Sequence, residues 1–81
     1  IYPQVLKNVK VKSKAEAQDD ADVQAEVQKA AEALGDTGRI LLRQSGTEPV
    51  IRVMVEAPTD EICEKYVDQV IDVMKAKGHI I

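Results

Sequence analysis

Residues 39–56 of the sequence read RILLRQSGTEPVIRVMVE, and this stretch decides the fold. Apolar residues recur at every second position in Arg39–Arg43, as Ile40 and Leu42, and in Val50–Glu56, as Ile51, Val53 and Val55, which is the period of a β-strand. The polar segment Gln44–Pro49 separates the two strands, so we expect an antiparallel hairpin. Both strands carry apolar residues on much of both faces, and we therefore expect them in the interior of the sheet.

A further strand is expected upstream, over Gln4–Lys12, with its apolar face formed by Val5, Val9 and Val11. Lysines are typical of a solvated edge strand that is protected against mispairing. We interpret the lysines of this region in that way rather than as a basic patch: Lys7, Lys10, Lys12 and Lys14. The segment Ser13–Gln18 shows no period and is expected to be a connection.

Two amphipathic helices are expected, one on each side of the hairpin. Asp19 and Asp20 can cap the first helix, and Gly35 can end it before a turn at residues 36–38. Thr59 can cap the second helix. The spacing predicts one buried stripe on each: Val23, Val27, Ala30, Ala31 and Leu34 on the first, and Ile62, Cys63, Tyr66, Val67, Val70, Ile71 and Met74 on the second.

The expected elements occur in the order strand, helix, strand, strand, helix. With short connections, this order favours an α+β fold in which two helices pack on one face of a small antiparallel sheet. We expect a single domain over residues 1–81, near the size at which one core becomes marginal. Because the chain has no Phe or Trp, aliphatic side chains must build that core.

Composition excludes several classes of function. The net charge of −3 argues against nucleic acid or an anionic membrane as the main partner. No apolar run approaches the roughly 18 residues of a membrane span, and no signal peptide opens the chain. A single cysteine, Cys63, fits a reducing, cytoplasmic setting. The chain starts at Ile1 rather than Met, and we expect it to be a piece of a longer protein.

The polar segment between the hairpin strands carries the groups that an anion site needs. Ser45 and Thr47 supply hydroxyl donors, and Gly46 permits positive φ and a close approach of an anion to the backbone. Arg43 and Arg52, one on each strand, offer planar forks that suit phosphate oxygens. Successive amides of such a turn can also form an anion nest. These residues alone leave two readings open, an anion site or an ordinary polar hairpin.

Glu48 lies within the same segment and would repel a phosphate. We expect its carboxylate to pair with one of the arginines or to accept hydrogen bonds from the loop backbone.

The string Arg43 to Pro49, RQSGTEP, followed by IRVMVE over residues 51–56, closely resembles the phosphate-binding loop of the α-D-phosphohexomutases. This form of the motif looks most like the phosphoglucosamine mutases, because phosphomannomutases more often have Asn where Gly46 stands. The opening YPQVLKNV, residues 2–9, also resembles the first strand of that superfamily's last domain.

The resemblance implies a C-terminal, substrate-phosphate-binding domain of a bacterial, cytoplasmic isomerase of four domains. Such an enzyme interconverts glucosamine 6-phosphate and glucosamine 1-phosphate through a bisphosphate, and so supplies UDP-N-acetylglucosamine and cell-wall precursors. Its phosphoserine, its Mg²⁺ and its sugar loop belong to the other domains, which are this domain's partners. The implied phosphate ligands are Arg43, Ser45, Gly46 through its amide, Thr47 and Arg52. No catalytic or metal-binding residue and no cofactor is expected in this chain, which should be inactive alone.

Two other interpretations remain open on the sequence. The same domain could serve a phosphomannomutase or phosphoglucomutase, since it recognises mainly phosphate. Alternatively, the chain could be a non-catalytic interaction module that docks through an apolar sheet face. Residues outside the loop are expected to have structural roles: a solvated helix face for Asp68 and Asp72, a buried position for Cys63, and a frayed tail for His79.

Overall fold

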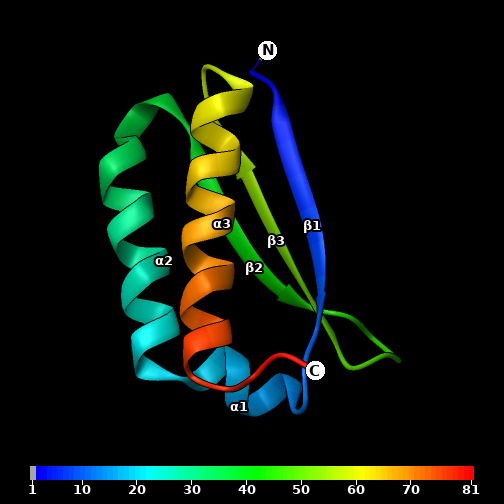
Figure 1. The fold of residues 1–81 in the computed structure, drawn as a ribbon. Helices are drawn as coiled ribbons and strands as arrows, with labels where there is room; N and C mark the ends of the chain where they lie inside the picture. The colour runs from blue at the N-terminus through cyan, green and yellow to red at the C-terminus, as the bar shows by residue number, and fades with distance from the viewer. Residues whose placement is uncertain (1) are drawn as a thin grey trace.

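A computed structural model describes residues 2–81 as one antiparallel sheet with helices packed on one face (Figure 1). The strands are β1 (Gln4–Lys10), β2 (Arg39–Gln44) and β3 (Val50–Glu56). The helices are α1 (Lys14–Asp19), α2 (Ala21–Leu34) and α3 (Asp60–Ala76), with a 3₁₀ turn, η1 (Gly35–Thr37), after α2. The expected α+β class is confirmed, and α1 is added to the expected order of elements.

The strand order is β1-β3-β2, so β3 occupies the centre and pairs with both neighbours. The predicted hairpin of β2 and β3 is confirmed, with Ile40 opposite Val55. The prediction that both strands lie in the interior was right for β3 and wrong for β2, which is an edge strand in the described sheet. Helices α1 and α2 pack against β2, and on the face toward them Ile40 is buried and Leu42 is half-buried against the core.

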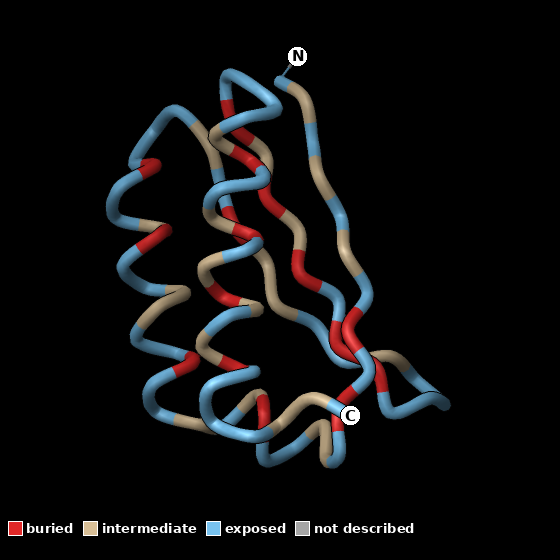
Figure 2. The backbone as a smooth tube through the Cα atoms, viewed as in Figure 1, coloured by how far each residue is buried: buried red, intermediate tan, exposed pale blue. Residues whose placement is uncertain are grey.

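The core lies between the sheet and helices α2 and α3. In β3, Ile51, Val53 and Val55 have no exposed surface, whereas the intervening Arg52 is exposed. Figure 2 shows this alternation along β3 and a buried stripe along each long helix. Each fully buried aliphatic side chain contributes about 1.5–3 kcal/mol relative to an exposed one, so these stripes hold the helices against the sheet.

Side-chain caps begin both long helices where the sequence predicted. The Asp20 carboxylate accepts the amides of Asp22 and Val23 at the start of α2, and the Thr59 hydroxyl accepts the amide of Ile62 in α3. Gly35 follows α2 with a φ of 55°, a conformation that favours glycine.

The segment expected to be a connection, Ser13–Gln18, instead forms the cap and most of the short helix α1. Ser13 caps α1, with its hydroxyl oxygen 3.4 Å from the Glu16 amide, and Ala17 is fully buried. A helix of six residues is too short for an apolar period to become visible in the sequence. Packing of Ala17 into the core, rather than an amphipathic pattern, therefore stabilises α1.

The C-terminal tail is also ordered, and the prediction that His79 frays was wrong. Val11 and Ile80 form an antiparallel bridge, and the Lys12 amide donates to the His79 carbonyl at 2.8 Å. The His79 Nε2 atom lies 2.8 Å from the Asp20 carboxylate, and each side chain is only 14% exposed. The tail thus joins the end of β1 to the start of α2 (Figure 1).

The lysine-rich strand β1 lies at the edge of the sheet, as predicted. Lys7 also pairs with Asp68 of α3 at 2.7 Å, and its side chain remains 41% exposed. Within residues 2–81, no helix has the length and apolarity needed to cross a membrane.

Candidate functional site

The loop of residues 45–49 projects from the sheet where β2 and β3 meet (Figure 1). Its tip, residues 46–49, is exposed, but its ends are firmly held. The Ser45 amide donates to the Val50 carbonyl at 2.9 Å, and the Val11 amide donates to the Pro49 carbonyl at 2.8 Å. The loop is therefore anchored to both β3 and the end of β1 while its tip stays open to solvent.

Two arginines stand at the base of this loop, as the sequence predicted. Arg43 on β2 lies directly opposite Arg52 on β3, and both are exposed. Their neighbours Leu42 and Val53 face the helices, so alternation places both arginines on the sheet face that the helices leave uncovered. Within residues 2–81, neither guanidinium forms an ion pair with a carboxylate.

The loop also offers backbone donors, although fewer than a full nest would. The Ser45 amide donates to the Val50 carbonyl, but the amides of Gly46 and Thr47 donate to no acceptor within residues 2–81. The hydroxyls of Ser45 and Thr47 are similarly free of hydrogen bonds in this part of the chain. The free donors are thus two amides and two hydroxyls beside the arginine pair.

Gly46 differs from the prediction in one respect. In the described chain the glycines with positive φ are Gly35 and Gly78, so Gly46 does not use the left-handed region. A Cβ built at Gly46 would meet no atom within 4 Å. The space beside its backbone is open, which is the property that a close approach by an anion requires.

Lys14 is a neighbour of the loop that the sequence reading missed. Its Nζ atom donates to the Ser45 carbonyl at 2.9 Å, and the residue is half-buried at the start of α1. The sequence interpretation had counted it among the lysines of the edge strand. The two residues are 31 positions apart, and only the tertiary fold brings them together.

Glu48 does not behave as predicted. No ion pair or hydrogen bond within residues 2–81 involves its carboxylate, and its backbone carbonyl accepts the Val50 amide at 2.7 Å instead. The exposed carboxylate therefore leaves the charge of Arg43 and Arg52 uncompensated.

The other side chains that the sequence analysis considered lie outside the loop. No group of three His, Cys, Asp or Glu side chains in residues 2–81 is placed to hold a metal ion. Asp68 and Asp72 are exposed on α3, as predicted, and Asp68 pairs with Lys7. Cys63 is fully buried, also as predicted, with its Sγ atom 3.4 Å from the Pro3 carbonyl.

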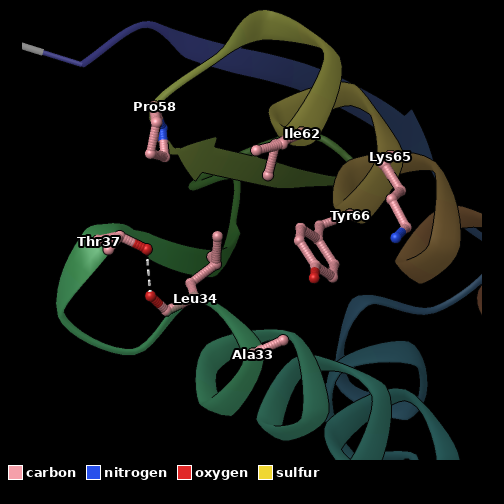
Figure 3. Close-up of a pocket in the computed structure, with 7 residues that line it drawn as sticks. All are labelled: Ala33, Leu34, Thr37, Pro58, Ile62, Lys65 and Tyr66. Carbon is pink, nitrogen blue, oxygen red and sulfur yellow. Dashed lines mark hydrogen bonds between the residues drawn. The ribbon is translucent and has the colours of Figure 1, made fainter.

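A surface cavity of about 250 Å³ lies at the other end of the hairpin, between α2 and the start of α3 (Figure 3). Its walls include Leu34, Ile62 and Tyr66. Lys65 supplies the cation there, and its Nζ atom lies 5.5 Å from the centre of the Tyr66 ring. The cavity offers a single cation, whereas the loop stands beside two arginines, so the loop remains the candidate site for a phosphate.

Apart from the exposed carboxylate of Glu48, the groups around the loop are donors and cations, a set that suits a dianion such as a phosphate monoester. The loop holds no nucleophile with an adjacent base and no acid–base pair.

Comparison with known proteins places these features in a family. The family described as "Phosphoglucomutase/phosphomannomutase, C-terminal domain" matches residues 6–73. The phosphoglucosamine mutase of Lachnospira eligens is 68% identical over 81 residues, which are 100% of this chain and 18% of that protein. The phosphoglucosamine mutase of Lachnoclostridium phytofermentans is 58% identical over 99% of this chain, again 18% of its own length.

Solved structures share the fold. Aspergillus fumigatus N-acetylphosphoglucosamine mutase, in complex with GlcNAc-6P and magnesium, superposes with a TM-score of 0.76 at 23% identity over 95% of this chain and 16% of that one. An N-acetylglucosamine-phosphate mutase of the α-D-phosphohexomutase superfamily, in its substrate complex, gives a TM-score of 0.72 at 27% identity over 90% of this chain and 15% of that one. The chain belongs to the family of phosphoglucomutase/phosphomannomutase C-terminal domains.

Proposed function

We propose that this chain is the substrate-phosphate-binding domain of a phosphoglucosamine mutase. The observation that carries the proposal is the cross-strand pair of Arg43 and Arg52, two exposed guanidiniums without a carboxylate partner, beside a loop with free donors. The proposed ligands are Arg43, Arg52, the hydroxyls of Ser45 and Thr47, and the amides of Gly46 and Thr47.

The relatives support the choice of substrate class. The two relatives compared above are phosphoglucosamine mutases, and the similar Aspergillus enzyme was solved with the sugar phosphate GlcNAc-6P. Gly46, where phosphomannomutases more often have Asn, favours the same assignment over a mutase of another hexose. The chain spans 18% of the length of those relatives, so the remaining domains are its proposed protein partners.

The proposed reaction interconverts glucosamine 6-phosphate and glucosamine 1-phosphate through a bisphosphate, in the bacterial cytoplasm, for cell-wall precursor synthesis. The loop would hold the phosphate that is not being transferred. A remote anchor of this kind positions the reacting hydroxyl and contributes binding energy away from the chemical centre.

The chemistry itself is assigned to the rest of the enzyme. A phosphoserine and Mg²⁺ are proposed there, because the resemblance of the loop to that of the phosphohexomutases implies them. This chain alone is therefore expected to bind phosphate without turning over a sugar phosphate.

A titration of the ¹⁵N-labelled chain with inorganic phosphate and then glucosamine 6-phosphate tests the proposal. The Gly46 and Thr47 amide resonances should shift first, because the Ser45 amide is already hydrogen-bonded. Affinity should be about millimolar, since the contacts of the other domains are missing.

Arg43→Ala should abolish the response while the fold is kept. Arg39→Ala is the matched control, because Arg39 is exposed on the same strand but pairs with Glu56 at 3.1 Å. Shifts that cluster away from the loop, or equal losses in both variants, would overturn the assignment.

A further inference from the structure

Lys14 fixes one peptide group of the loop through a single hydrogen bond. Its Nζ atom lies 2.9 Å from the Ser45 carbonyl oxygen, and Lys14 and Ser45 are both half-buried while the loop tip is exposed. A hydrogen bond from a charged donor is stronger than one between neutral groups. The Ser45 carbonyl is thereby held toward α1.

The orientation of that carbonyl determines the orientation of the next amide. The Ser45 carbonyl and the Gly46 N–H belong to the same planar peptide unit, and the described chain contains no cis peptide bond. In a trans peptide the C=O and N–H bonds point in opposite directions. Holding the carbonyl toward Lys14 therefore turns the Gly46 N–H away from α1, where it meets no protein acceptor within residues 2–81.

Lys14 can act in this way because α1 is itself fixed. Ala17 is fully buried, and α1 packs against β2 and β3. The same region carries the bond from the Val11 amide to the Pro49 carbonyl at 2.8 Å, which holds the other end of the loop. The segment from Val11 to Ala17 thus contacts both ends of the loop and sets its conformation from outside the hairpin.

We propose that Lys14 is a positioning residue of the phosphate loop: by holding the Ser45 carbonyl, it presents the Gly46 amide to the substrate phosphate. This inference rests on the proposed phosphate site. Lys14 approaches the loop from α1, whereas Arg43 and Arg52 lie on the sheet face that the helices leave uncovered. Cations on two sides of the loop would also raise the local concentration of a dianion.

Three variants of the ¹⁵N-labelled chain test the role of Lys14 in a titration with inorganic phosphate. Lys14→Met removes the donor and the charge, and Lys14→Arg keeps both. Lys12→Met removes one equivalent charge at a nearby exposed lysine and serves as the matched control.

Lys14→Met should shift the Gly46 amide resonance before phosphate is added, because its peptide loses its anchor. The same variant should bind phosphate about three- to tenfold more weakly, the effect of losing one charge-assisted contact that organises the site. Lys14→Arg and Lys12→Met should bind within about twofold of the wild type, and the thermal midpoint of every variant should stay close to that of the wild type.

The outcomes separate the two proposals. If phosphate shifts no amide resonance of the wild-type loop, the proposed function is wrong, and so is the role of Lys14. If the wild type responds and Lys14→Met binds equally well, or if Lys12→Met weakens binding as much as Lys14→Met, the positioning role is overturned and the phosphate site stands. Should Lys14→Met fold poorly, Lys14→Leu provides the same comparison with a shorter side chain that has neither donor nor charge.

Discussion

Arg43 and Arg52 are directly opposed across β2 and β3, both exposed, at the base of the loop that joins these strands. Like charges in such a cross-strand position destabilise a sheet, by roughly the 0.2–1 kcal/mol that an opposite-charge pair would contribute. No carboxylate within residues 2–81 relieves this pair. A bound dianion would convert the repulsion into two favourable contacts. The arginine pair is therefore unfavourable in the empty loop and favourable when an anion is bound.

Replacing one of these arginines should therefore separate stability from binding. Arg43→Gln should leave the unfolding free energy in phosphate-free buffer unchanged, or raise it by up to about 1 kcal/mol, because the repulsion disappears. Thermal unfolding with and without added phosphate measures both properties, and the rise in the midpoint that phosphate causes in the wild type should be lost.

Arg39→Gln provides the comparison for this experiment. It removes the ion pair with Glu56, an exposed contact worth roughly 0.2–1 kcal/mol, and should retain the phosphate-induced rise in the thermal midpoint. A loss of more than about 1 kcal/mol in Arg43→Gln without phosphate would show that Arg43 has a structural role instead.

The same added methyl group should lower the unfolding free energy at Gly38 and leave it almost unchanged at Gly46. A Cβ at Gly38 would lie 2.2 Å from the Glu56 carbonyl oxygen. Gly38→Ala must therefore push the strands apart where β2 begins and β3 ends. Its extended backbone suits any residue, and the close contact alone requires glycine here. We expect a loss of about 1–3 kcal/mol or more, measured by urea unfolding.

Gly46→Ala is the paired control, because its methyl group would meet nothing within 4 Å. Its unfolding free energy should stay within about 1 kcal/mol of the wild type. Equal losses in the two variants would contradict the close approach of the backbone at Gly38.

The contact between His79 and Asp20 predicts an acid-sensitive step in stability. The hydrogen bond from His79 lowers the pKa of Asp20 in the fold, and the amides of Asp22 and Val23 and the charge of Lys77 act in the same direction. A carboxylate whose pKa is lower in the folded chain contributes stability above its unfolded pKa. That contribution disappears as the pH falls through the lower, folded pKa.

Asp20→Asn should remove this step while an amide oxygen still caps α2. The variant should be less stable than the wild type near neutral pH, and the difference should shrink as the pH falls below the usual aspartate pKa of about 3.9. Urea unfolding across this range measures it. A difference that stays constant with pH would mean that the charge of Asp20 is irrelevant.

Substitutions in the aliphatic core should cause the largest losses of unfolding free energy. Ile51 in the central strand is fully buried, and Ile51→Ala should lower the unfolding free energy by about 2–5 kcal/mol, a large part of the total for a domain of this size. Leu6, on the uncovered face of β1, is 53% exposed, and Leu6→Ala should cost less than about 1 kcal/mol. Chemical denaturation of both variants tests the contrast, and a comparable loss in Leu6→Ala would contradict the exposed position of Leu6.

Much of this molecule could be predicted from local patterns. The alternation in Arg39–Glu56 predicted the hairpin, and the stripes that contain Val23 and Val67 predicted the long helices, because each pattern extends over enough residues to be unambiguous. Pairing partners were less predictable. The apolar faces of β2 suggested an interior strand, but the side chains on the faces do not determine which backbone edges are paired, and β2 lies at the edge of the described sheet.

By itself, the sequence determined the class of fold, the hairpin and the identity of the loop residues from Arg43 to Arg52, since these depend on period, turn chemistry and a contiguous motif. Tertiary structure alone decided that α1 exists, that Lys14 holds Ser45, and that His79 contacts Asp20. The contacts of Lys14 and His79 join residues 31 and 59 positions apart, and a sequence pattern carries no information about which distant residues packing brings together. Helix α1 is too short to show a pattern of its own.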